Sequence, residues 1–167
     1  MPESATTATT GLALRFRPMT IGDALAAHRW RYPGEYGIYD LGLTPLLFSA
    51  IFRSTLRLAG VYSLAVDTSS ERLISVFSLI QRGTDVELGV GMRPDLMGRG
   101  LGLDVMLQGM DYARQRLHDV ETFSLDVATF NKRAITVYSR AGFQPGHLHP
   151  FYFGRQRYES MRMSRPA

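Results

Sequence analysis

The sequence predicts an α/β domain of the α+β type, in which a mixed, mostly antiparallel sheet of six or seven strands is flanked by about four helices. Two observations support this fold class. Three strand-type segments follow one another between residues 60 and 92, as antiparallel strands joined by turns do. Helix-type and strand-type segments then alternate, which places helices on the faces of the sheet. The expected order is β-α-α-β-β-β-α-β-α-β-β.

The first elements are indicated by alternation and by helix caps. Residues 14–17 alternate apolar and charged side chains, as a strand does. Thr20 and Asp23 have the spacing of a capping box, which begins a helix ending near Arg31. Residues 30–40 are rich in aromatic side chains without a clear period, so we expect a loop with at most a short helix. Thr44 and Pro45 open a second helix to about residue 57.

The later elements follow from hydrophobic periodicity and from glycine stops. We expect strands at 60–66, 73–81, 84–92 and 123–129, and last strands at Phe143 and at 151–163, with a turn over 144–150. Apolar residues at helical spacing predict a helix over 103–117. A final helix spans 131–141 and ends at Gly142.

Composition restricts the class of protein. The 167 residues fit one domain over 13–166, preceded by a disordered tail over 1–12. The absence of cysteine excludes disulfides and thiolate metal sites and is compatible with a reducing cytoplasm, where we expect this protein. No apolar run is long enough to cross a bilayer, and residues 1–10 lack the features of a secretory signal. We expect no metal, and a monomer or a homodimer.

Net charge gives little support to a nucleic-acid partner. The formal charge is +4, and eighteen of the nineteen basic residues are arginines, with Lys132 as the single lysine. The arginines are scattered among acidic residues, whereas nucleic-acid binding predicts a patch or a stripe. An arginine-mediated association with RNA is therefore a third hypothesis, behind two functions that involve a small molecule.

The segment from Val90 to Gly102 predicts an anion site. A strand-type run ends at Pro94, and alternating glycines at 98, 100 and 102 lead into a helix. Such glycines allow close approach of the backbone, and a helix N-terminus offers free N–H groups to phosphate. A P-loop would need a lysine beside the last glycine, and a dinucleotide fingerprint would need glycine where Leu103 or Pro94 stands, so both patterns fail.

Two motifs resemble the GNAT superfamily of acyl-CoA-dependent N-acyltransferases. Gly100 and Gly102 match the small residues of the motif Arg/Gln-x-x-Gly-x-Gly/Ala, while Met97 stands at its Arg/Gln position. The stretch Asn131–Phe143 matches the family's Asn-x-x-Ala-x-x-x-Tyr-x-x-x-Gly-Phe segment. Asn131 and Tyr138 lie seven residues apart and so share a helix face, where one long ligand would touch both.

The resemblance implies acetyl transfer from acetyl-CoA to an amine. It assigns cofactor binding to two segments and to the final helix; these residues are Val90, Gly91, Met92, Met97, Gly98, Arg99, Gly100, Leu101, Gly102, Asn131 and Tyr138. Backbone N–H groups near Met92 would hold the thioester carbonyl, in a gap between two strands. Tyr138 would protonate the departing thiolate as general acid.

The acceptor side is indicated by residue type alone. A free alkyl amine has a pKa of about 10, so its attack needs a base or a water chain to solvent. Glu87 is the first candidate base, followed by Glu35 and Asp40 and by His147 and His149. We expect four aromatic residues and one carboxylate to line the pocket for a small-molecule or peptide amine. These residues are Trp30, Tyr32, Tyr36 and Tyr39, with Glu35. The alternative function is a non-catalytic acyl-CoA sensor on the same fold.

Overall fold

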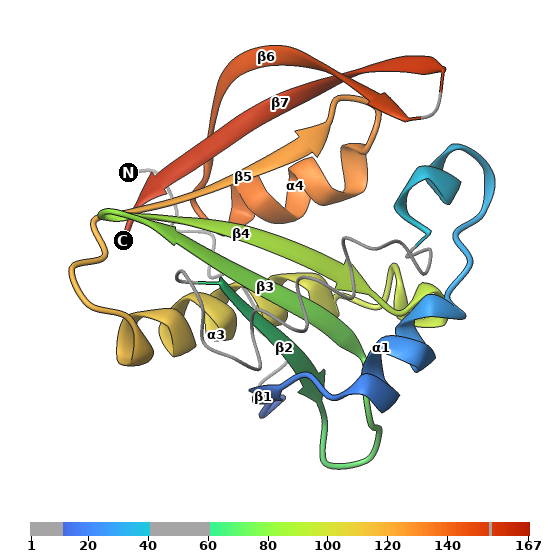
Figure 1. Cartoon of the computed structure of the whole chain (residues 1–167), viewed down its shortest axis with the longest axis vertical. Coiled ribbons are helices and arrows are strands. Elements are labelled where there is room, and N and C mark those ends of the chain that lie inside the picture. Colours follow the sequence, from blue (N-terminus) through green and yellow to red (C-terminus); the bar gives the residue numbers. More distant parts are fainter. Residues whose placement is uncertain (1–11, 41–60, 154) are drawn as a thin grey trace, which may run out of the picture.

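The computed structural model describes residues 12–40, 61–153 and 155–167. They form a seven-stranded sheet in the order β1-β2-β3-β4-β5-β7-β6 (Figure 1). The strands are β1 (Arg15–Pro18), β2 (Val61–Asp67), β3 (Ser75–Arg82), β4 (Asp85–Met92), β5 (Thr122–Ala128), β6 (Gln144–Phe153) and β7 (Gln156–Pro166). Among these strands β4 and β5 pair in parallel and all other neighbours pair antiparallel. The expected fold class is confirmed.

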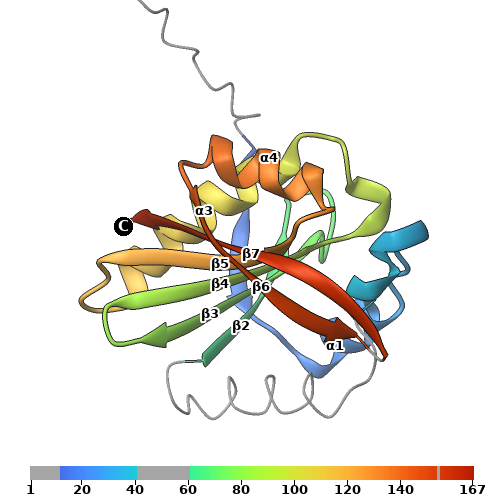
Figure 2. The same ribbon diagram turned by 90° about the horizontal axis from the view of Figure 1, so that it is seen from above.

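The described helices lie on both faces of the sheet. The described helices are α1 (Ile21–His28), η1 (Gly34–Tyr39), η2 (Pro94–Leu96), α3 (Leu101–Arg116) and α4 (Lys132–Arg140), η marking 3-10 turns. Figure 2 shows α3 and α4 on one side of the sheet and α1 on the other. The larger core lies beneath α3, where a Cβ at Gly109 would come within 2.5 Å of the Phe77 ring. The smaller core joins Ala27 and Trp30 to Ala65 and Leu73.

A network of ion pairs ties α1 to the edge of the sheet. The expected capping box is present, with Thr20 and Asp23 bonding each other's backbone N–H groups. Arg17 binds both Asp23, at 2.6 Å, and the buried carboxylate of Asp67, at 2.8 Å. These contacts lower the pKa of Asp23 to about 2, chiefly through the hydrogen bond from Arg17. Desolvation by burial raises the pKa of Asp67, but hydrogen bonds from Arg17, Arg15 and the Leu73 N–H outweigh it. The pKa of Asp67 is therefore lowered well below its usual value.

Two expectations about the chain differ from the structure or fall outside it. The prediction of the last strands is wrong. Residues 144–150 belong to β6 instead of a turn, and the range 151–163 contains the end of β6 and the first part of β7, which pair as a β-hairpin. Gly146 and two prolines in β6 resemble turn residues, but the pairing with β7 shifts register between Pro145 and Leu148 and so accommodates them. The helix over 44–57 and the tail up to residue 11 lie outside the described residues.

The parallel pair of strands opens partway along its length. Pairing of β4 with β5 covers Asp85–Glu87 against Thr122–Ser124 and stops there. Antiparallel pairing continues on the outer side of each strand, with β3 along all of β4 and with β7 along all of β5. The sheet therefore divides beyond Glu87, and the two strands leave a wedge between them.

Candidate active site

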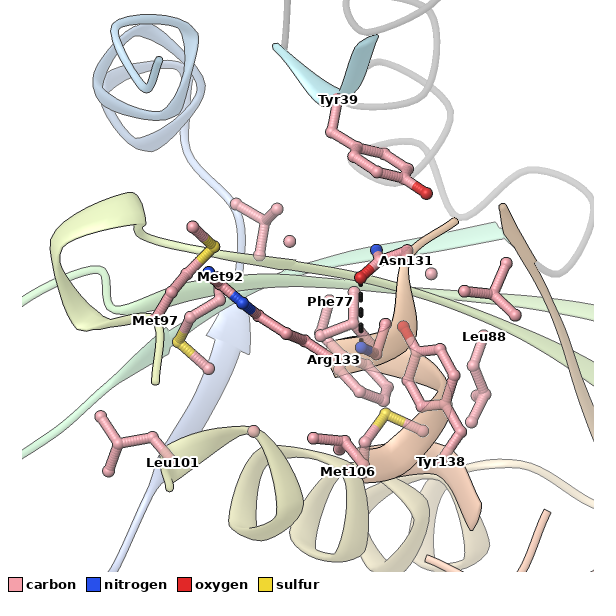
Figure 3. Close-up of a pocket in the computed structure, with 18 of the residues that line it drawn as sticks. Tyr39, Phe77, Leu88, Met92, Met97, Leu101, Met106, Asn131, Arg133 and Tyr138 are labelled. Atoms are coloured by element: carbon pink, nitrogen blue, oxygen red, sulfur yellow. Dashed lines mark hydrogen bonds between the residues drawn. The ribbon is translucent and has the colours of Figure 1, made fainter. Parts of the chain in front are cut away.

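A cavity of about 760 Å³ occupies this wedge. Its lining comes from both faces of the sheet, from the glycine loop and from the facing sides of α3 and α4. Figure 3 shows side chains from these elements converging on one space, in which Met97 and Leu101 lie apart from Tyr39, Asn131 and Tyr138. The cavity is thus long, and its two ends are built from different parts of the chain.

The glycine loop forms one end, as the sequence indicates. Gly98 and Gly100 have φ values of +77° and +81°, in the left-handed region that favours glycine, and Gly100 is the N-cap of α3. A Cβ at either position would meet no atom within 4 Å, so the backbone borders open space. Gly102 lies against Val137 of α4. The loop presents backbone N–H groups at the N-terminus of a 16-residue helix, as an anion site requires.

Positive charge reaches this end from α4. Met97 lines the cavity, while Arg99 is exposed and lies outside its lining. The two cationic side chains in the described lining are Arg133 and Arg140. They flank Val137, the residue that contacts Gly102, at four and three positions along the helix and therefore on the same face. Figure 3 shows Arg133 extending across the cavity toward Met92 and Met97.

Asn131, Tyr138 and Tyr39 meet at the middle of the cavity. Asn131 caps α4 through the N–H of Ala134, at 3.2 Å, and Tyr138 lies two turns along the same helix. Burial, and to a smaller extent the nearby Tyr39 phenol, raise the pKa of Tyr138 above its usual value near 10. The Tyr39 hydroxyl is buried beside the Asn131 side chain and makes no hydrogen bond of normal geometry within the described structure. Two protonated phenols therefore face the space between β4 and α4.

The aromatic residues expected around the acceptor divide into two groups. Tyr32, Tyr36 and Tyr39 line the cavity. The Tyr32 hydroxyl donates to the carbonyl of Met92 at 2.8 Å, and burial, reinforced by the charge of Asp40, raises its pKa to about 12. Trp30 is buried in the small core outside the lining, and Glu35 is exposed on η1. Tyr36 lies under the guanidinium of Arg133, 5.4 Å from ring centre to carbon.

The candidate bases also separate. Glu87 lies outside the cavity lining and is held by Arg162, at 3.5 Å, and by Arg82, at 3.9 Å. This geometry favours an ion-pair role for Glu87. Arg162 also binds Asp126 at 2.8 Å, and Asp126 is the one carboxylate in the lining that the described residues provide. His149 lies on β6, not in a turn, with its Nε2 3.6 Å from Asp126.

The site also contains residues that were not predicted from the sequence. Asp126, Arg133 and Arg140 carry its charge, and a recess beneath α1 is formed by Met19, Ala24, Ala27 and Val76. The arginines stand at helical spacing from Val137, a signal available in the motif itself. No local pattern marks the recess, because its residues come from segments that meet through tertiary packing. In the described ranges no helix is long and apolar enough to cross a membrane, and no three His, Asp or Glu are grouped to hold a metal ion.

Sequence comparison finds one family and one curated relative. The family model described as an acetyltransferase (GNAT) domain matches residues 13–144. A mycothiol acetyltransferase of Rhodococcus erythropolis is 35% identical over 101 residues. That alignment covers 56% of this chain and 33% of the relative, so the chain spans about a third of the length of the curated protein it matches.

Structure comparison finds the same fold at low identity. A spermidine N-acetyltransferase from Vibrio cholerae in complex with CoA and spermine has a TM-score of 0.76 and 18% identity, and covers 92% of this chain and 95% of its own. A dodecameric structure of spermidine N-acetyltransferase from the same organism has a TM-score of 0.71 and 20% identity, with coverage of 92% and 93%. At these identities the similarity shows the fold.

Proposed function

The chain belongs to the acetyltransferase (GNAT) domain family, and from this premise we propose that it transfers an acetyl group from acetyl-CoA to a primary amine by direct attack on the thioester. The observation that carries the proposal is one continuous cavity that joins the glycine loop to Asn131 and Tyr138. The two motifs that identify the family therefore line one space, although a strand and a helix separate them in the sequence.

The residues present fit acetyl-CoA. The backbone at Gly98, Gly100 and Leu101 would hold the pyrophosphate at the start of α3, where open space adjoins both glycines. Arg133 and Arg140 would supply the charge that the family places at the position of Met97. The edge of β4 beyond Glu87 would hold the pantetheine arm, since Val90, Gly91 and Met92 have no pairing with β5 in the described sheet. Asn131 borders the same stretch.

Three groups would perform the chemistry. Acetyl-CoA, when bound, supplies the acetyl group as an activated thioester. Backbone N–H groups of β4 near Met92 would stabilise negative charge on the carbonyl oxygen. The carbon–sulfur bond breaks as the carbon–nitrogen bond forms, and Tyr138 would give its proton to the departing sulfur. The raised pKa of Tyr138 keeps it protonated at neutral pH, which a general acid requires.

The amine must lose a proton for each turnover. We assign the role of proton acceptor to the carboxylates around Arg162. Asp126 lies at the cavity wall, and Glu87, the last residue of β4 that pairs with β5, lies behind it. Arg162 holds both carboxylates, together with that of Asp85 at 3.6 Å, on the sheet face opposite α3. The described lining offers Asp126 as the direct partner of an incoming ammonium group.

Calorimetry and thiol release test the proposal together. We expect acetyl-CoA and CoA to bind with micromolar dissociation constants, and free thiol to appear in proportion to added amine. Absence of binding at hundreds of micromolar would exclude the cofactor. Binding without thiol release over a broad amine panel would instead favour the non-catalytic acyl-CoA sensor.

A further inference from the structure

The recess beneath α1 is a second compartment of the cavity. Met19, Ala24, Ala27 and Val76 line it, and Tyr32 closes it against Gly91 and Met92. It lies on the sheet face that carries α1, whereas the glycine loop, α3 and α4 lie on the other (Figure 2). The cavity reaches both faces through the wedge between β4 and β5. A molecule in the recess therefore meets the end of β4 from the side opposite the cofactor.

The recess is apolar, and its helix wall is built from small residues. Ala24 and Ala27 are 2% and 1% exposed, and they present methyl groups three residues apart on one face of α1. Met19 and Val76 pack against the same helix. An alkyl or aryl group placed here would be stabilised by the removal of its apolar surface from water.

Free negative charge is limited in the described lining of this part of the cavity. Asp126, the carboxylate of the described lining, is already bound by Arg162 at 2.8 Å. Asp40 accepts the N–H of Tyr32 and lies 3.9 Å from Arg31.

A second ammonium group on the acceptor would therefore be desolvated without a partner. Moving an isolated charge out of water is unfavourable unless a counter-charge and hydrogen bonds replace its hydration. At this end the described lining provides one carboxylate, Asp126, which is itself paired with Arg162. This balance disfavours a polycation and leaves one position, at Asp126, for the single reacting amine.

We propose that the acceptor is a monoamine with an apolar alkyl or aryl body, which occupies the recess formed by Met19, Ala24, Ala27 and Val76 while its nitrogen lies beside Asp126. This inference rests on the proposed acetyl transfer and names its substrate class. It separates this chain from the spermidine N-acetyltransferases whose fold it shares.

Two amines of equal size test the inference. Hexylamine and 1,5-diaminopentane have the same number of non-hydrogen atoms and differ only at one end. Hexylamine ends in a methyl group, whereas 1,5-diaminopentane ends in a second ammonium group. We expect hexylamine to have a kcat/KM at least about tenfold higher, the scale on which an apolar pocket discriminates single groups. Calorimetric titration of each amine into the CoA-loaded protein should show the same order of affinity.

A charge introduced in the wall of the recess should weaken the preference for hexylamine. Met19→Glu places a carboxylate on a side chain of similar length beside the recess, and we expect it to narrow the ratio by at least about tenfold in favour of 1,5-diaminopentane. Met19→Gln, of the same shape but neutral, should leave the ratio within about threefold of the wild type. Thermal denaturation and acetyl-CoA affinity of both variants show whether each is folded.

Affinity and turnover separate the two proposals. Selective binding of hexylamine without thiol release would support the acceptor class and contradict the proposed catalysis. Equal or stronger binding of 1,5-diaminopentane, or of spermidine, by the wild-type protein would overturn the acceptor class. Failure of both hexylamine and phenethylamine to bind the CoA-loaded protein at millimolar concentration would overturn it as well.

Discussion

The two ends of the cavity are built in different ways. The glycine-loop end, where we propose that the cofactor binds and which we call the cofactor end, is built mainly of backbone: left-handed glycines, a helix N-terminus and a strand edge that β5 leaves unpaired. The end beneath α1, which we propose for the acceptor and call the acceptor end, consists of side chains from α1, η1, β3 and β5, which meet through tertiary contacts and through the ion pairs of Arg17. Backbone devices tolerate substitution at neighbouring side chains, as Met97 illustrates. Side-chain walls change with every substitution, so we expect the specificity of the acceptor end to be the more sensitive to mutation.

The largest expected effect concerns the ion pairs that hold α1. Asp67 is buried, with 1% of its side chain exposed, and accepts hydrogen bonds from Arg15, Arg17 and Leu73. Asp67→Asn should lower the free energy of unfolding by about 3 kcal/mol at pH 7, because it leaves Arg17 with half its partners. Urea denaturation measures this, with Asp95→Asn on the exposed η2 turn as the control. Equal midpoints for both variants would contradict the role of the network.

The same network predicts acid sensitivity of the acceptor end. The pKa values of Asp67 and Asp23 are lower in the folded protein than in the unfolded chain. Their stabilisation is therefore complete above about pH 4 and is lost as the pH falls through the folded values, near 2 for Asp23. The difference between wild type and Asp67→Asn should shrink between pH 4 and pH 2. A difference that grows toward acid would show that another group controls α1.

The next effect concerns chemistry in the middle of the cavity. Tyr138→Phe should lower kcat by about 100-fold, the smaller end of the usual range for a general acid, while the acetyl-CoA dissociation constant stays within about twofold. Because burial raises the pKa of Tyr138, its deprotonation should not reduce wild-type kcat below pH 10. Tyr39→Phe is the matched control for loss of a buried phenol. An unchanged kcat in Tyr138→Phe would remove this residue from the mechanism.

A smaller effect sharpens the account of the cofactor end. Arg133→Gln and Arg140→Gln should each weaken acetyl-CoA binding by about tenfold and reduce its salt dependence, since each removes a charge-assisted contact with phosphate. Arg99→Gln, outside the lining, should change affinity by less than about twofold. Met97→Arg should tighten binding. If Arg99→Gln alone weakened binding, the charge would reside on the glycine loop instead of on α4.

The smallest effect distinguishes two carboxylates. Asp126→Asn should reduce kcat/KM by about tenfold, because Asp126 lines the cavity, whereas Glu87→Gln should reduce it by less than about threefold, because Glu87 serves mainly to hold Arg162. The two pH profiles of kcat/KM, each measured with hexylamine, make the comparison. A larger loss in Glu87→Gln, with displacement of the acid limb of its profile, would assign the base to Glu87.

The sequence was sufficient to predict that the glycine loop and the motif of the final helix face one ligand, because the signals of both segments are local. Gly98 to Gly102 and Asn131 to Phe143 specify backbone conformation and helix faces within short windows, and the structure brings them to one cavity. The acceptor end required tertiary information: Trp30 and Tyr32 are neighbours with similar side chains, yet Trp30 enters a core and Tyr32 reaches Met92. The misplaced final strands show the same limit, since pairing with β7 overrides the turn propensity of residues 144–150.

The wedge between β4 and β5 also has a consequence for folding. Because β4 stops pairing with β5 after Glu87, backbone groups on the facing edges of these strands are free to form hydrogen bonds with a ligand in the gap. A ligand that binds this native edge and not the unfolded chain adds about 2.7 kcal/mol to stability at a hundred times its dissociation constant. The acetyl donor would then occupy a place between two strands and stabilise the sheet, besides being a reactant. A higher concentration of the donor would therefore increase the resistance of the protein to proteolysis.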